Sequence, residues 1–80
     1  MKEELKKQFA SNVKAERVRA GLTQRETAER LGITVRQYIN YEQGRRIDQL
    51  TLFRLSRIFN CSIDAFFLKF TSTEGGYKGA

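Results

Sequence analysis

Two helix-start signals stand on either side of Gly32, and no other feature of this chain constrains its fold as strongly. Thr23 is followed three positions later by Glu26, and Thr34 is followed in the same way by Gln37. Each pair has the form of a capping box, in which a hydroxyl and a Glu or Gln side chain satisfy each other's backbone amides. Glycine is the residue through which a chain most easily leaves a helix in a left-handed turn. The pattern therefore predicts two short helices joined by a tight turn, which is a helix-turn-helix.

Apolar periodicity and further cap residues predict five helices and no strands. The expected fold is a compact all-α bundle that contains the helix-turn-helix as its second and third helices. The first three helices are expected over residues 3–20, 24–31 and 35–43, while Asp48 and Ser62 are N-cap types that predict a fourth and a fifth start. The residues expected on the buried faces are Leu5, Phe9, Val13, Ala28, Leu31, Tyr38, Tyr41, Leu52, Leu55, Phe59 and Phe66.

The length of 80 residues allows one domain with one modest core, which we expect to cover residues 1–70. Residues 71–80 offer little apolar surface to bury, and we expect them to form a disordered tail. Fifteen Lys and Arg against nine Asp and Glu give a net charge of +6. Such a balance is common on small proteins, but it also fits a polyanionic partner such as nucleic acid.

The residues present disfavour several classes of function. Cys61 is the single cysteine and histidine is absent, so the sequence offers neither an intrachain disulfide nor a Cys/His metal site. We find no nucleophile–base pair and therefore expect no enzyme activity, no cofactor and no small-molecule ligand. The charged start, residues 1–7, is unlike a signal peptide, and no apolar run is long enough to span a membrane, so we expect a cytoplasmic protein.

The helix expected at residues 35–43 divides into two faces. Tyr38 and Tyr41 face the expected core. The opposite face has no acidic residue and carries Val35, Arg36, Ile39, Asn40 and Gln43, at helical spacings of three, four and seven. Arg can bind guanine and Asn can bind adenine in the major groove of DNA, while Val or Ile can pack on a thymine methyl. We therefore predict that this helix reads double-stranded DNA. The alternative explanation of the Val and the Ile is that they are ordinary, scattered apolar residues of the surface.

Other polar groups flank this helix and are candidates for binding the DNA backbone. Gln24 begins the second helix, where the first-turn N–H groups favour an anion. Gln43, Arg45 and Arg46 follow the third helix and would border the groove. Such phosphate contacts position a protein without selecting a sequence. A solvated run of loop charges is the alternative explanation for these residues.

The chain resembles the helix-turn-helix domains of the lambdoid phage repressor and Cro proteins over about residues 9–68. The strings that carry the resemblance are Gly21-Leu22-Thr23-Gln24, Ala28-Glu29-Arg30-Leu31-Gly32-Ile33-Thr34, Tyr41-Glu42-Gln43-Gly44-Arg45 and Cys61-Ser62-Ile63-Asp64. The strings are specific jointly, although each alone is weak. The resemblance implies a five-helix, lambda-repressor-like bundle that binds operator DNA as a homodimer and regulates transcription.

The resemblance also implies roles for individual residues. The family's base-reading positions fall on Thr34, Val35, Arg36, Ile39 and Asn40, and its phosphate positions fall on Gln24, Gln43 and Arg45. This family often pairs an arginine near the end of the first helix with the glutamate before the glycine of the third, and here these are Arg17 and Glu42. Two residues depart from the family pattern: Thr27 stands where leucine is usual, and Ile39 stands where a polar residue is usual.

The expected fifth helix and its exit carry more apolar side chains than one helix face can bury. We expect Phe67 and Phe70 to contribute to a dimer interface, because pairing two reading helices doubles the contacts to DNA. The alternative is that these rings fold back under the first helix.

Two functions from different classes fit the sequence. The first is a sequence-specific transcriptional regulator, a repressor from a phage or mobile element that acts by occupying operator DNA. The second is an antitoxin or another protein-interaction module that uses the same fold to cover a partner.

Overall fold

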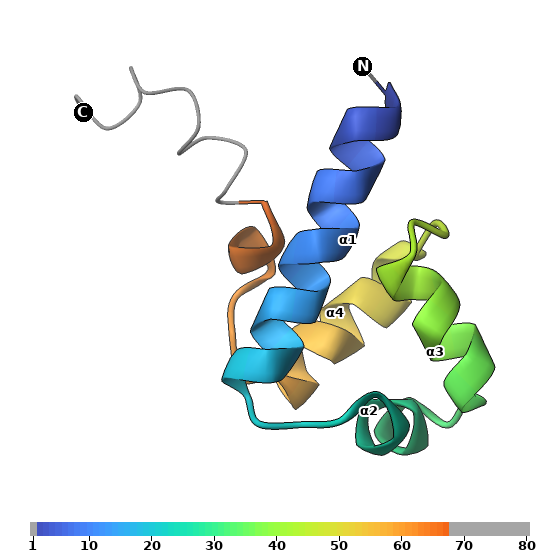
Figure 1. The fold of residues 1–80 in the computed structure, drawn as a ribbon. Coiled ribbons are helices and arrows are strands. Elements are labelled where there is room, and N and C mark those ends of the chain that lie inside the picture. The colour runs from blue at the N-terminus through green and yellow to red at the C-terminus, as the bar shows by residue number, and fades with distance from the viewer. Residues whose placement is uncertain (1, 68–80) are drawn as a thin grey trace.

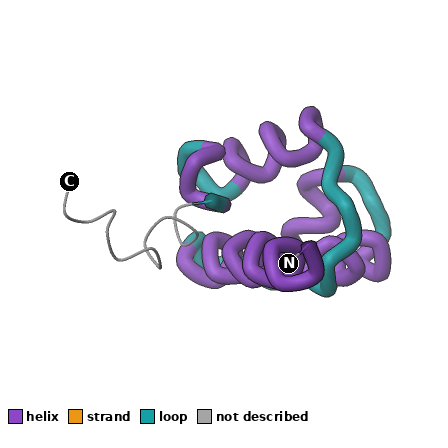
Figure 2. Tube along the Cα trace, turned by 90° about the horizontal axis from the view of Figure 1, so that it is seen from above, coloured by secondary structure: helices purple, strands orange, loops and turns teal. Residues whose placement is uncertain are grey.

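The computed structural model describes residues 2–67, which fold into helices and connecting turns without a strand (Figures 1 and 2). The elements in chain order are α1 (Lys2–Arg19), α2 (Gln24–Leu31), α3 (Val35–Glu42), α4 (Gln49–Ile58) and the 3-10 helix η1 (Ile63–Phe66). α1 crosses the front of the molecule in Figure 1, with α3 to its right, α2 below and α4 behind. Helices 2 and 3 therefore form the predicted helix-turn-helix. No helix in this part of the chain combines the length and the apolar character needed to cross a membrane.

The expectation of five α-helices is corrected at the C-terminal end of the described chain. Residues 2–67 contain four α-helices, and the expected fifth is a single 3-10 turn. Ser62 has the extended backbone of an N-cap, but its side chain makes no capping hydrogen bond. The turn is closed by hydrogen bonds from the Ala65 N–H to the Ser62 carbonyl and from the Phe67 N–H to the Asp64 carbonyl. Bonds between residues three apart, over a segment of four residues, are typical of the tighter 3-10 geometry.

Both predicted capping boxes are formed. The Glu26 N–H donates to Thr23 Oγ1 at 3.0 Å, and the Thr23 N–H donates to Glu26 Oε1 at 2.9 Å. The bond from the Thr23 N–H also lowers the pKa of the Glu26 carboxyl. At α3 the Gln37 N–H donates to Thr34 Oγ1 at 3.1 Å, and the Thr34 N–H donates to Gln37 Oε1 at 3.0 Å. These reciprocal bonds fix where α2 and α3 begin.

Replacing Gly32 by alanine tests the turn between α2 and α3. Gly32 has φ +78° and ψ +30°, and its N–H donates to the Ala28 carbonyl at 2.9 Å. A Cβ built there meets no atom within 4 Å, so the cost comes from the left-handed backbone alone. We expect a loss of about 1–2 kcal/mol in the free energy of unfolding, measured by urea denaturation. Gly32→Asn should cost less, because Asn tolerates this conformation better; an equal loss in both variants would contradict the explanation.

The core lies where α1, α2, α3, α4 and η1 meet. Its buried apolar side chains are Val13, Ala28, Leu31, Tyr38, Leu55, Phe59 and Phe66, all from the faces predicted to be buried. Phe9, Tyr41 and Leu52 are half-buried and pack against this cluster. Leu5 was wrongly placed on the buried face: its side chain is 54% exposed, because the first turns of α1 extend beyond the elements that cover the core (Figure 1).

Buried polar side chains complete the packing, among them Thr27 and Asn12. Thr27, which replaces the family's usual leucine, is fully buried, and its hydroxyl donates to the Thr23 carbonyl at 2.9 Å. Asn12 of α1 is buried as well; its Nδ2 donates to the Phe66 carbonyl at 2.7 Å, while its Oδ1 accepts from Gln8 Nε2 at 3.0 Å. Because both side chains have partners, neither carries the cost of an unpaired polar group.

Candidate nucleic-acid interface

The second helix of the motif, α3, is anchored by its two tyrosines. Tyr38 is fully buried, and its ring meets that of Tyr41 edge-on, with centroids 6.2 Å apart and planes at 87°. The Tyr38 hydroxyl donates to Glu42 Oε2, four residues along the same helix. Burial together with this bond raises the pKa of Tyr38 far above its ordinary value. The inner face of α3 is thus held by packing and by a polar bond, which leaves its outer face to solvent.

Glu42 also joins α3 to α1 and α2. Arg17 Nε donates to Glu42 Oε2 at 2.6 Å and Arg17 Nη2 donates to Glu42 Oε1 at 3.3 Å, so the pair named by the family resemblance is formed in the structure. The side chains are only 11% and 4% exposed, respectively. Arg17 Nη1 donates to the Leu22 carbonyl at 2.8 Å, and Glu42 raises the pKa of the arginine. One carboxylate therefore fixes the angle at which α3 meets α1.

Gln24 has a partner that the sequence did not suggest. Its Nε2 donates to Glu42 Oε1 at 3.0 Å, so the side chain tethers the start of α2 to the end of α3. The amide still has a second N–H, and Gln24 is half-buried rather than enclosed. Its assignment to a DNA phosphate therefore stays a prediction, now limited to the remaining donor.

The outer face of α3 presents the residues predicted to read bases. Arg36 is exposed, Ile39 and Asn40 are half-exposed, and Val35 is half-buried against the core cluster. Thr34 is exposed, but its hydroxyl oxygen accepts the Gln37 N–H of the capping box. Arg36 and Asn40 thus present hydrogen-bond donors on an accessible surface. Val35 is partly covered by the core and partly exposed to solvent.

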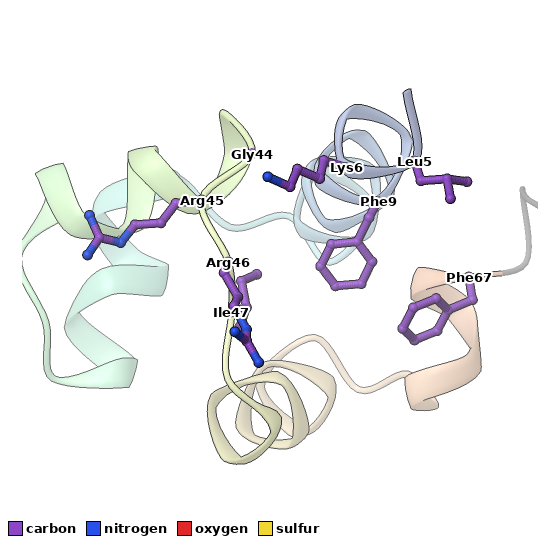
Figure 3. A pocket seen from close by; sticks show the side chains of 8 residues that line it. All are labelled: Leu5, Lys6, Phe9, Gly44, Arg45, Arg46, Ile47 and Phe67. Carbon is purple, nitrogen blue, oxygen red and sulfur yellow. The ribbon is translucent and has the colours of Figure 1, made fainter. Parts of the chain in front are cut away.

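The segment after α3, residues 43–46, carries the remaining predicted phosphate contacts. It is held by hydrogen bonds from the N–H groups of Gln43 and Arg45 to the Asn40 carbonyl, at 3.0 and 2.9 Å. Gln43, Arg45 and Arg46 are all exposed. Figure 3 shows Arg45 and Arg46 leaving this segment in different directions, with Lys6 of α1 reaching toward Gly44. The backbone is thus held at Gln43 and Arg45, and the polar side chains of the segment are accessible to solvent.

An apolar groove of about 690 Å³ lies between this segment, α1 and the end of η1 (Figure 3). Phe67, one of the two residues predicted at a dimer interface, lines it together with Phe9. Their ring centroids are 5.2 Å apart, and Phe67 is 39% exposed. Phe67 therefore contacts the first helix while part of its surface remains accessible. Phe70 lies outside the described residues, as does the expected tail at 71–80.

Alkaline pH is expected to weaken the fold through Tyr38. Its pKa is raised from 10.0, so the folded state keeps this proton above the pH at which the unfolded chain releases it. The protonated Tyr38 hydroxyl therefore makes its full contribution to the free energy of unfolding below pH 10.0. As the pH rises further, this contribution falls by up to about 1.4 kcal/mol per pH unit. Urea midpoints of the wild type and Tyr38→Phe, measured from neutral pH upward, should therefore converge above that point. If the two midpoints instead keep a constant difference as the pH rises, Tyr38 is not the group that makes stability depend on alkaline pH.

Comparison with known proteins supports the arrangement found in the structure. A family model described as Helix-turn-helix matches residues 13–66. An uncharacterized HTH-type transcriptional regulator of Bacillus subtilis (strain 168), YqaE, is 42% identical over 67 residues, which are 82% of this chain and 57% of that protein. The chain thus spans little more than half the length of this relative. No solved structure gives a significant match. The sequence matches confirm the family resemblance predicted from the motifs.

Proposed function

The chain belongs to the helix-turn-helix family, and from this we propose that it is a sequence-specific DNA-binding regulator of transcription. The observation that carries the proposal is the outer face of α3. Arg36, Ile39 and Asn40 are accessible there on a helix whose inner face is fixed by Tyr38 and by Glu42. An α-helix fits the major groove of DNA, and Arg and Asn have specific partners on its base edges.

Basic and amide side chains border this face on the C-terminal side of α3. Gln43, Arg45 and Arg46 are exposed there, and no acidic residue lies among residues 43–46. In our proposal these residues bind phosphates beside the groove, together with the remaining N–H of Gln24, whose amide lies at the same end of α3. Those contacts would place the same face of α3 against the bases in each complex.

We propose further that the protein is a repressor of a phage or mobile element and that it binds operator DNA in the cytoplasm as a homodimer. Repression by occupancy needs no catalysis, so the protein acts without enzyme activity or a cofactor. One α3 contacts only a few base pairs, and two copies related by a twofold axis would read a pseudo-palindrome. The accessible part of Phe67 supports this part of the proposal as a candidate for the contact between copies.

Selection of bound sites from random double-stranded DNA tests the proposal. We expect enrichment of a short inverted repeat whose half-sites lie about one helical turn apart, roughly 34–36 Å, on one face of the duplex. A single unrepeated site would contradict the dimer but not DNA binding. Failure to enrich any sequence, together with recovery of a stoichiometric protein partner from cells, would favour the protein-interaction module instead.

A further inference from the structure

The first half of α1 lies outside the region that the family model matches, and it borders the proposed DNA site. The matched region begins at residue 13, whereas α1 begins at Lys2. A small groove of about 270 Å³ separates α1 from the end of α3. Its lining residues are Lys7, Ala10, Ser11 and Lys14 from α1, and Glu42 and Gln43 from the end of α3. The α1 side of this groove is therefore basic and hydroxylic, and it adjoins a predicted phosphate contact.

The α1 side of the groove is a regular stripe of one helix face. Lys7, Ser11 and Lys14 follow at spacings of four and three residues, and all three are exposed. Seven residues of helix separate the two lysines, which corresponds to about 10 Å along the axis. Phosphates of one DNA strand follow at roughly 3.4 Å along the duplex axis. This spacing along α1 exceeds the step between neighbouring phosphates, so it is compatible with contacts from the two lysines to different phosphates of one strand.

Neither Lys7 nor Lys14 forms an ion pair with an acidic residue in the described part of the chain. Among the side chains that the structure describes, those of residues 3–67, the ion pairs are Arg17–Glu42 and Arg19–Glu16. Glu42 is the acidic residue that lines the groove, and its oxygens already accept from Arg17, Gln24 and Tyr38. The positive charge of Lys7 and Lys14 is therefore available to an external anion.

We infer that Lys7, Ser11 and Lys14 form a second backbone-binding edge, which holds DNA phosphates next to the one held by Gln43. The inference rests on the proposed DNA-binding function, and it assigns to α1 a contact that α2 and α3 do not supply. The edge carries no base-reading group, so it adds affinity and salt dependence equally for all sequences. It also lengthens the DNA site beyond the groove that α3 occupies.

The same lysines could instead act on the stability of α3, and this role predicts a different experimental result. Cations near the end of α3 also stabilise that helix through its dipole, by roughly 0.3–1 kcal/mol each at low salt. That effect would appear in the urea midpoint of the free protein. It would leave the phosphates that the protein contacts unchanged.

The test compares two variants that lose the same charge. Lys7→Gln with Lys14→Gln removes the edge, whereas Arg30→Gln with Arg57→Gln removes two exposed cations from the last turns of α2 and α4, away from the groove. Binding to the selected duplex is measured between roughly 50 and 200 mM salt. We expect the plot of log affinity against log salt to become shallower by roughly 1.8 for the lysine variant and by much less for the arginine control, with base preference unchanged in both.

Ethylation interference supplies a readout that a structural effect would not change. Ethylation at one or more phosphates outside the α3 groove should block the wild type and the arginine control but not the lysine variant. Salt dependence equal to that of the control, or an unchanged ethylation pattern, would overturn the second edge while leaving the proposed function intact. If the wild type binds no DNA at all, the proposed function and this inference both fail.

Discussion

Glu42→Ala is expected to lower the free energy of unfolding by about 3–5 kcal/mol, because it leaves the largely buried Arg17 guanidinium without its counter-ion. Arg17 Nε lies 2.6 Å from the carboxylate, and the two side chains are only 11% and 4% exposed. The same change removes the acceptor of the Tyr38 hydroxyl and of the Gln24 amide. A chain of 80 residues has a total stability of roughly 4–12 kcal/mol. Glu42→Ala should therefore leave a substantial unfolded fraction at room temperature.

Urea denaturation followed by circular dichroism measures this loss, and Glu16→Ala is the matched control. Glu16 pairs with Arg19 at 2.7 Å, a distance close to that of the buried pair, but that arginine side chain is 53% exposed. Exposed pairs contribute about 0.2–1 kcal/mol. Glu42→Gln keeps one side-chain oxygen as an acceptor and should fall between the two. If Glu16→Ala and Glu42→Ala lower the free energy of unfolding by similar amounts, burial is not the reason why the Glu42 bonds stabilise the fold.

The helix-turn-helix could be predicted closely because its determinants are local. A capping box is complete within four consecutive residues, so the starts of α2 and α3 follow from Thr23 and Thr34 without knowledge of the rest of the fold. Gly32 marks the end of α2 for the same reason, since its left-handed backbone is a property of one residue. The end of α3 was expected at residue 43 and lies at Glu42, with Gln43 as its C-cap.

Other features depend on segments distant in the sequence, and periodicity could not supply them. Leu5 has the spacing of a buried residue, but whether it is buried depends on how far the remaining elements extend along α1. The Gln24 amide meets Glu42 only because α3 ends beside the start of α2. Nothing in the sequence pattern predicted that Asn12, a polar residue of α1, would be buried. Its side chain nevertheless donates to the backbone carbonyl of Phe66 across the bundle. Each of these contacts exists only after the bundle has formed.

α3 contributes both to the stability of the fold and to the proposed recognition of DNA. A substitution in this helix can therefore change either property or both. Tyr38 and Glu42 hold the helix from inside, so changing them would alter both folding and DNA binding. Arg36 is exposed, and no hydrogen bond or ion pair of its side chain is found within residues 2–67. A substitution at Arg36 should therefore change binding while leaving the fold intact. This separation makes Arg36 the cleanest residue at which to test base reading.

Arg36→Ala is expected to cost about 1–3 kcal/mol in binding at one base pair of each half-site, because the guanidinium can bind a guanine through O6 and N7. Selection from random DNA should then show relaxed preference at that base pair and unchanged preference elsewhere. Asn40→Ala should do the same at a different base pair, one at which the wild type prefers adenine. The urea midpoint of Arg36→Ala should match that of the wild type, since Ala is at least as favourable as Arg within a helix.

Arg45→Ala is the control, because Arg45 is predicted to bind phosphate rather than a base. This variant should weaken binding to all sequences alike and make the salt dependence shallower by roughly one unit of slope. Relaxed preference after Arg36→Ala but not after Arg45→Ala would separate base reading from backbone binding within one helix and its exit. If Arg36→Ala instead leaves the selected site unchanged, α3 does not read DNA through this face, and the orientation proposed for the helix-turn-helix is wrong.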